Sequence, residues 1–287
     1  MSVEQYWAPA SLPDALEHLR GGDVTILAGG TDLMPQSHAG RVTLQRGLLN
    51  IRRVPELHRI ERDGAGVRIG ALCTVSELMR DPLVRAQFGI LAEACDHFAS
   101  DQLRNAATIG GNVCNASPAG DLLIPLLVLD GEAELASKPN GIVDTRRMPL
   151  AEFFVGPGKT KRAPDELLCA IWLPLPLKGF AGRFFKFGVR PALDISAIAI
   201  GIGGVRVGNV LTHARVAYGA VAPVPMRAPR TEAALEGCVL DPAAIERIAG
   251  VARDEVRPID DVRASAWYRR ELVFNMTRRM LDDVAQA

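Results

Sequence analysis

The chain has 287 residues, 48% of them apolar and 23% charged, a composition typical of a globular protein with one large domain or two smaller ones. The 33 basic residues are balanced by 33 acidic residues, which gives no support for a nucleic-acid-binding surface. No apolar run is long enough to cross a membrane, and the polar residues 1–7 do not predict a secretory signal, so we expect a soluble cytoplasmic protein.

The first hundred residues predict short helices and strands. Ser11, Pro13 and Asp14 are typical of a helix start, and a Gly-Gly pair at 21–22 is typical of its end. Strands are predicted at 24–28 and 47–51, and a hairpin at 60–62 and 67–70. A capping-box pattern at residues 74–77 predicts a helix start. A longer helix is predicted from about residue 82, and another at 90–99.

The next part of the chain combines one apolar helix with several strands. Residues 122–129 predict the helix, and the strands are predicted at 133–136, 142–144 and 166–173. Two prolines end the last strand, so we place a domain boundary at 174–180.

Beyond this boundary, strands are expected first and helices afterwards. The strands are predicted at 182–189, 196–203, 205–207 and 210–219, and they form an antiparallel meander. The helices are predicted at 231–236, 242–256 and 264–284. Strands followed by a run of helices predict an α+β domain.

Two glycine-rich segments, which we expect to form loops, are the main candidates for a functional site. The first is LAGGTDL at residues 27–33. The second is ATIGGN at residues 107–112, which continues through ASPAGDL at 116–122. Paired glycines allow positive φ angles, so backbone N–H groups can converge on one anion. We interpret the segments as two sides of a site for a phosphate-bearing cofactor, although a single Gly-Gly pair is more typical of an ordinary turn.

Other catalytic and nucleotide-binding motifs are missing from the sequence. There is no Walker A loop and no nucleophile elbow. Residues 201–204 come nearest to a dinucleotide fingerprint, but a turn rather than a helix follows them. Asp121 has no His or carboxylate nearby in sequence for acid–base catalysis. Such a site suits a cofactor that carries out the chemistry itself.

The cysteines and histidines do not predict a metal site. The cysteine number is odd, no Cys-x-x-Cys pair occurs, and the five histidines lack metal-ligand spacing. Most of the thiols are expected to be buried. The five cysteines are Cys73, Cys95, Cys114, Cys169 and Cys238.

The glycine-rich segments resemble the paired flavin motifs of the FAD-binding, or medium, subunits of the molybdenum hydroxylase family, which includes xanthine dehydrogenase and carbon monoxide dehydrogenase. The resemblance covers nearly the whole chain. Further segments that carry it are FFVG at 153–156, PDELL at 164–168, FKF at 185–187, ALDI at 192–195, GAVAP at 219–223 and YRR at 268–270.

The resemblance implies an α+β protein with two domains. Residues 1–176 would form an FAD-binding domain of the vanillyl-alcohol-oxidase (PCMH) type, with subdomains at about 1–55 and 56–176. Residues 177–287 would form a C-terminal α/β domain like that of the CO dehydrogenase flavoprotein. FAD would lie between the subdomains.

The resemblance also implies the cofactor-binding residues, but no catalytic residue and no metal ligand on this chain. The first segment would surround the pyrophosphate, the second would contact phosphate or ribityl oxygens, and Asp121 would lie at the adenosine or ribityl side. Leu168 and Lys186 would lie beside the isoalloxazine ring. The full set is Leu27, Ala28, Gly29, Gly30, Thr31, Asp32, Leu33, Thr108, Ile109, Gly111, Asn112, Ser117, Asp121, Leu168 and Lys186.

Several of these residues also have a purely structural explanation. Asp32 and Asp121 could cap the helices that follow them. Lys186 could be a solvated strand residue and Leu168 a core residue. Asp194 could cap a loop or lie near the flavin.

The resemblance implies an electron-transfer subunit with two kinds of partner. A large subunit with a molybdenum–pterin cofactor would hydroxylate the substrate, and a small subunit with two [2Fe-2S] clusters would relay the electrons. FAD on this chain would pass them to NAD, a quinone or a similar acceptor. We expect a dimer of heterotrimers, and as substrate a purine or other N-heteroaromatic compound, then an aldehyde, then carbon monoxide.

The sequence departs from the family at two places. Residues 156–160 are GPGKT where the family often has GYRKT, which could alter the acceptor side. The cluster-binding insertion of the 4-hydroxybenzoyl-CoA reductase branch is absent from 112–122.

Two alternative functions are less well supported by the sequence. A stand-alone flavin oxidase is disfavoured because no substrate base is evident. An assembly subunit without FAD is disfavoured by the intact glycine segments.

Overall fold

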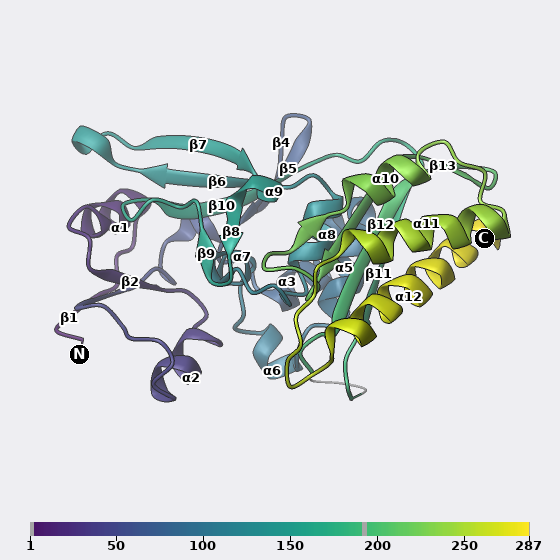
Figure 1. Cartoon of the computed structure of the whole chain (residues 1–287). Helices are drawn as coiled ribbons and strands as arrows, with labels where there is room; N and C mark the ends of the chain where they lie inside the picture. Colours follow the sequence, from purple (N-terminus) through teal and green to yellow (C-terminus); the bar gives the residue numbers. More distant parts are fainter. Residues whose placement is uncertain (1–2, 191–193, 287) are drawn as a thin grey trace.

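The computed structural model describes residues 3–190 and 194–286. Ala192 and Leu193, which begin the ALDI segment, lie outside the described residues. Within the described part, the strands form three sheets and one two-stranded hairpin, and helices pack on the sheets (Figure 1). This arrangement of mostly separate sheets and helices confirms the expected α+β class.

The N-terminal sheet is small and parallel, with the strand order β1-β3-β2. Its strands and the two nearby helices are β1 (Gln5–Trp7), β2 (Val24–Leu27), β3 (Gly47–Asn50), α1 (Leu12–Leu19) and α2 (Leu33–His38). The Ser11 hydroxyl accepts a hydrogen bond of 3.3 Å from the backbone N–H of Asp14, which confirms the predicted helix start. The sequence does not predict β1, because three residues are too few to show a periodic pattern. Helix α2 is predicted only as the helix that Asp32 could cap.

The second sheet is antiparallel, with the strand order β4-β5-β10-β6-β7. Its strands are β4 (Ile60–Asp63), β5 (Gly66–Gly70), β6 (Glu132–Ser137), β7 (Asp144–Pro149) and β10 (Leu167–Pro174). Its apolar side chains share a core with several of the short helices that follow β5.

The short elements around this sheet are irregular and closely spaced. The helices are α3 (Val75–Arg80), α4 (Pro82–Gln87), α5 (Gly89–Asp96), α6 (Asp101–Arg104), α7 (Ile109–Asn115), α8 (Leu123–Val128) and α9 (Leu150–Phe153). The 3-10 helices are η1 (Pro55–Leu57) and η2 (Pro139–Gly141), and the hairpin consists of β8 (Phe154–Gly156) and β9 (Lys159–Thr160).

Three local predictions in this region are wrong. The helix expected to be long from residue 82 ends after six residues, because Phe88 is not helical (φ −127°, ψ 56°). The strand expected at 142–144 lies instead at Asp144–Pro149, where it pairs with β6 beyond η2. The segment expected as a loop at 107–112 contains the first turn of α7.

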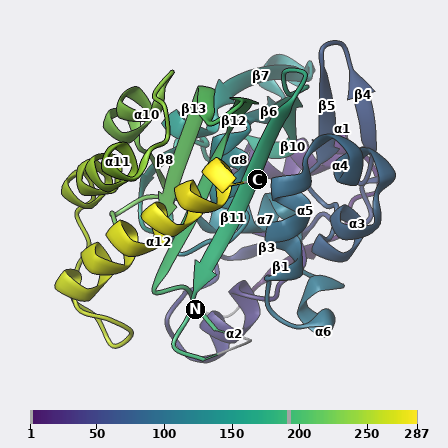
Figure 2. The same cartoon turned by 90° about the vertical axis from the view of Figure 1, so that its right-hand side faces the viewer.

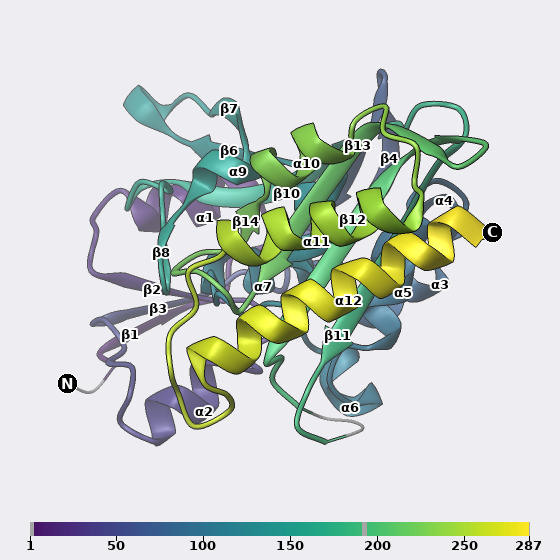
Figure 3. The same ribbon diagram turned by 45° about the vertical axis from the view of Figure 1, so that its right-hand side comes forward.

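The third sheet has the order β11-β12-β13-β14 and confirms the predicted antiparallel meander. The strands expected separately at 196–203 and 205–207 form one strand, and a short strand at Met226–Arg227 was not predicted. Helices α10, α11 and α12 cover one face of it (Figures 2 and 3). The elements are β11 (Phe180–Phe187), β12 (Ile198–Val207), β13 (Val210–Gly219), β14 (Met226–Arg227), α10 (Pro229–Leu235), α11 (Pro242–Glu255) and α12 (Ala266–Gln286).

The sequence of β12 explains how this sheet packs on both faces. Its large residues belong to the core shared with the C-terminal helices, namely Ile198, Ile200 and Ile202. Small residues alternate with them and face α8. A Cβ atom on Gly201 would lie 2.9 Å from Val128 Cγ2 and 3.0 Å from Ile124 Cγ2, so glycine here permits the close approach of α8. Residues 201–204 therefore belong to a strand interior and not to a nucleotide-binding loop.

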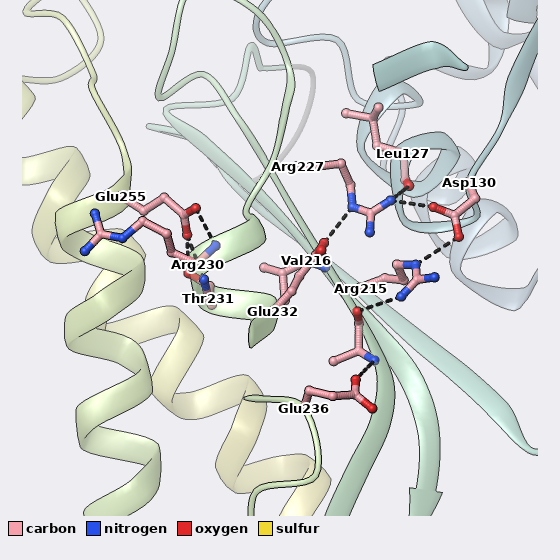
Figure 4. A network of polar contacts seen from close by, with 11 residues as sticks. Leu127, Asp130, Arg215, Val216, Arg227, Arg230, Thr231, Glu232, Glu236 and Glu255 are labelled. Carbon is pink, nitrogen blue, oxygen red and sulfur yellow. Dashed lines mark hydrogen bonds and ion pairs between the residues drawn. The ribbon is translucent and has the colours of Figure 1, made fainter. Parts of the chain in front are cut away.

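An ion-pair network joins α8 to the third sheet on the side of β14 (Figure 4). Asp130 accepts hydrogen bonds from Arg215 Nε (2.9 Å) and Arg227 Nη1 (2.5 Å). Arg227 also donates to the Leu127 carbonyl (3.1 Å) and to Glu232 in α10 (2.6 Å). Arg227 thus links the end of α8, strand β14 and helix α10.

We expect Asp130→Asn to lower the free energy of unfolding by about 1 kcal/mol, since it neutralises a half-exposed carboxylate that holds two guanidinium groups. Asparagine is the appropriate replacement because residue 130 has a positive φ of 52°, which Asn tolerates. Urea denaturation would measure the change. Asp254→Asn is the control, because Asp254 pairs only with its exposed neighbour Arg253 among the described side chains. Equal effects of the two variants would contradict a linking role for Asp130.

Candidate functional site

The first glycine-rich segment forms a bend at the end of β2 with unpaired backbone donors. Gly30 has a φ of +74°, and its carbonyl accepts from the backbone N–H of Met34 (3.0 Å). The N–H groups of residues 29–32 donate to no group in the described part of the chain. Several neighbouring free N–H groups in a glycine-rich bend are suited to binding an anion.

The two glycine-rich segments lie against each other. A Cβ atom on Gly29 would lie 1.9 Å from the carbonyl oxygen of Ala106 and 3.3 Å from Cα of Ala107. Only glycine allows the backbone of the first segment to approach the second this closely. The structure therefore brings together the two segments that the sequence analysis singled out.

In the second segment, several backbone N–H groups that we expected to bind an anion are already hydrogen-bonded within the protein. Thr108 is the N-cap of α7, and its hydroxyl accepts from the N–H of Gly111 (3.1 Å). The N–H groups of Ile109 and Gly110 donate to carbonyls of the 71–73 segment at 3.0 and 2.9 Å. The expected anion-binding loop at 107–112 is thus wrong for these donors. The Ile109 side chain is fully buried in the core.

Asn112 carries an unpaired polar atom in this region. Its Oδ1 atom is buried and has no hydrogen-bond partner among the described residues. Leaving a buried acceptor without a donor is unfavourable, so Oδ1 is suited to accept from a ligand hydroxyl or amide.

The segment that follows α7 is held by parts of the chain that are distant in sequence. Ala116 has a positive φ of 45°, and its carbonyl accepts from the N–H of Gly158 in the β8–β9 hairpin (3.2 Å). The carbonyl of Pro118 accepts from the N–H of Ala220 (2.7 Å). The Ser117 hydroxyl accepts from the N–H of Ala119 (3.3 Å), so its hydrogen atom can be donated elsewhere.

Asp121 and Lys186, two predicted site residues that are distant in sequence, form a buried ion pair. Lys186 Nζ lies 2.6 Å from Asp121 Oδ2, and Ser196 Oγ donates to Asp121 Oδ1 at 2.8 Å. Lys186 Nζ also approaches the His97 carbonyl at 3.4 Å. Both paired side chains are 10% exposed. Burial raises the pKa of Asp121, and the nearby Lys186 opposes this shift.

The structure excludes the purely structural explanations of Asp121 and Lys186. Asp121 does not cap α8, because the N-cap of that helix is Leu122 and no side chain caps it. Lys186 is not a solvated strand residue, since its side chain is largely buried.

The remaining candidates have the following environments. Asp32 occupies the N-cap position of α2 without capping it, and it accepts instead from Gln36 Nε2 (2.7 Å). Leu168 is 3% exposed and lies in the central core. Asp194 accepts from the backbone N–H groups of Val189 (2.6 Å) and Ile195 (2.9 Å), as expected for a residue that caps a loop.

Sequence reasoning missed Ser196 and Ala106. Neither of them belongs to a recognisable motif, and each acts through contacts that are distant in sequence. The neighbouring ALDI segment was the only indication that Ser196 lies near the site.

The described residues contain no candidate metal site, and the thiol in the second segment is buried. Within 3–190 and 194–286, no group of three or more His, Cys, Asp or Glu side chains could hold a metal ion. Burial raises the pKa of Cys114 to about 11, so this thiol stays protonated near neutral pH. No helix in the same ranges is long and apolar enough to span a bilayer.

Comparisons with known proteins give the same family over nearly the whole chain. Residues 2–176 match the FAD binding domain in molybdopterin dehydrogenase, and residues 183–284 match the CO dehydrogenase flavoprotein C-terminal domain. The xanthine dehydrogenase FAD-binding subunit of Escherichia coli O157:H7 is 32% identical over 286 residues, covering 98% of this chain and 96% of that protein. The carbon monoxide dehydrogenase medium chain of Hydrogenophaga pseudoflava is 31% identical over 281 residues, covering 97% and 96%.

A solved structure from the same family has the same fold as this chain. A chain of reconstituted CO dehydrogenase from Oligotropha carboxidovorans superimposes with a TM-score of 0.92 at 28% identity, covering 100% of this chain and 98% of that chain.

Proposed function

Because the chain belongs to the FAD-binding subunits of the molybdenum hydroxylase family, we propose that it is the electron-transfer subunit of a heteromeric molybdenum-containing hydroxylase. With FAD bound, the subunit would receive electrons from [2Fe-2S] clusters on a small partner subunit. It would pass them to an external acceptor such as NAD or a quinone. When bound, FAD supplies a carrier that exchanges both single electrons and electron pairs.

The residues of the site fit FAD. The free N–H groups of residues 29–32 suit the negative charge of the pyrophosphate. Asn112 Oδ1 lacks a donor, and the ribityl chain and the adenosine carry hydroxyl groups that can supply one. The bend at residues 29–32, placed against Ala106, is the observation that carries the proposal.

Individual roles are proposed for this chain's residues. Residues 27–33 would hold the pyrophosphate. Thr108, Gly111, Asn112 and Ser117 would line the neighbouring side, and the Asp121–Lys186 pair would close the site from the third sheet. Leu168 and Ile109 would support it from the core, since both side chains are buried.

We also propose the domain limits. Residues 1–176 would form the FAD-binding domain, divided near residue 55, and residues 177–287 the C-terminal domain. The division near residue 55 is supported by the change from the parallel sheet to the antiparallel sheet, and the limit at 176 by the start of the third sheet at Phe180.

The partners and the substrate are proposed from the family. A large subunit with a molybdenum–pterin cofactor would bind the substrate, and two copies of the heterotrimer would associate. A purine or another N-heteroaromatic compound is the proposed substrate, because a xanthine dehydrogenase subunit is among the similar proteins. A cytoplasmic location stays a prediction of the sequence.

We expect the purified chain to bind FAD and to show flavin absorption bands. Because the free N–H groups at 29–32 suit a diphosphate, FAD should bind more tightly than FMN, and riboflavin should bind most weakly. Titration of the flavin-free chain, followed by flavin fluorescence, measures the three affinities. A chain that gains no flavin bands with excess FAD, or that binds riboflavin as tightly as FAD, would contradict the proposal.

A further inference from the structure

A buried arginine on the last helix connects the two strand ends that reach the site. Arg269 lies in the first turn of α12, which crosses the third sheet in Figure 3. Its residue surface is 2% exposed. Its Nη1 atom donates to the carbonyls of Ala197 and Ala220, both at 2.6 Å, and its Nη2 atom donates to Asp261 Oδ1 at 2.7 Å.

Both carbonyls lie close to contacts with the 116–121 segment. Ala197 follows Ser196, whose hydroxyl donates to Asp121. Ala220 donates its own N–H to the carbonyl of Pro118 at 2.7 Å. One guanidinium group therefore fixes two of the contacts by which the third sheet reaches this segment; the Lys186–Asp121 ion pair is a third.

The backbone at one of these points is strained. Ala220 has a φ of +60°, a conformation that is unfavourable for an L-residue with a Cβ atom and persists only where its surroundings impose it. Its N–H is held by Pro118 and its carbonyl by Arg269. Without the guanidinium, two buried carbonyls would lose a charged donor.

We propose that Arg269 is a positioning residue for the FAD site, which acts on Pro118 and Asp121 through the backbones of Ala220 and Ala197. This proposal rests on the proposed function for the identity of the ligand. Among the described residues, the Arg269 guanidinium forms hydrogen bonds with Ala197, Ala220 and Asp261, none of which is assigned to the cofactor. It would instead position the loop and the carboxylate that contact FAD.

The test compares Arg269→Met and Arg269→Lys with Arg278→Met in the full chain. Arg278 lies on the same helix and makes an exposed ion pair with Glu246, so it controls for loss of an arginine from α12. Hydrogen exchange of the FAD-free proteins, read by mass spectrometry over residues 116–122, reports the loop itself. FAD titration reports the site.

We expect Arg269→Met to speed exchange at 116–122 and to weaken FAD binding roughly tenfold or more. Arg269→Lys should restore part of both losses, because an ammonium can still donate to one carbonyl. Arg278→Met should change neither. If Arg269→Met fails to fold, Arg269→Lys against wild type gives the same comparison with a smaller effect.

A double-mutant cycle with Ser196→Ala separates positioning from general weakening. If Arg269 acts through Ser196 and Asp121, the loss of FAD affinity from Ser196→Ala should be smaller in the Arg269→Lys background than in wild type. Independent, additive losses would overturn the proposal, as would unchanged exchange at 116–122. A wild-type chain that binds no FAD, while the exchange results hold, would instead refute the proposed function.

Discussion

Replacing Gly29 by alanine is expected to weaken FAD binding on the order of 10- to 100-fold. The added Cβ atom would lie 1.9 Å from the carbonyl oxygen of Ala106, which is backbone and cannot rotate away. The bend must then move from the 106–107 segment, at a cost of about 1–3 kcal/mol, and each 1.4 kcal/mol corresponds to about a tenfold loss of affinity. Titration of the flavin-free protein with FAD would measure the change.

Gly21→Ala is the matched control for this variant. Gly21 lies in the same part of the chain, has no positive φ, and has no heavy atom within 4 Å of an added Cβ atom. The control should bind FAD like the wild type. If Gly29→Ala also bound FAD normally, the close approach of the two segments would have no role in the site.

Lys186→Met is expected to lower the free energy of unfolding by about 3–5 kcal/mol, because it leaves a buried carboxylate without its counter-ion. Asp121 would keep only the Ser196 hydroxyl as a partner among the described residues. Burial already raises its pKa, and loss of the ammonium should raise it further. Urea denaturation of the flavin-free chain would measure the loss of stability.

The double variant Asp121→Asn/Lys186→Met distinguishes loss of a pair from loss of a side chain. Removing both charges leaves no unpaired ion in the interior, so this variant should recover most of the stability lost in Lys186→Met. It should still bind FAD less tightly than wild type if the pair closes the site. Equal losses in the single and double variants would contradict a buried ion pair at this position.

The sequence predicts the site better where chemistry is local. Glycine pairs, a capping threonine and an aspartate in a short motif can be recognised from neighbouring residues, and the structure places the two glycine segments together. The conformation of residues 107–112 was mistaken because a glycine pair suits both a loop and the start of a helix. The choice depended on the carbonyls of the 71–73 segment, which no local pattern reveals.

The pairing of side chains across the molecule could not be derived from the residues alone. Lys186 and Asp121 meet because strand β11 and helix α8, which are separated by many residues, pack around the same core. Ser196 and Arg269 belong to the same case. The sequence did predict an apolar strand of small residues at 196–203. In the structure, the alternation of isoleucine with alanine and glycine in β12 explains why α8 can pack directly on it.

The position of Arg269 in α12 has a consequence for the order of events during biosynthesis. The ribosome adds both glycine-rich segments early, but Arg269 emerges only after almost all of the described chain has been translated. If Arg269 positions the neighbouring loop as proposed, a nascent polypeptide that stops before α12 would hold FAD less tightly than the finished chain. We therefore expect most flavin loading to follow translation of the last helix.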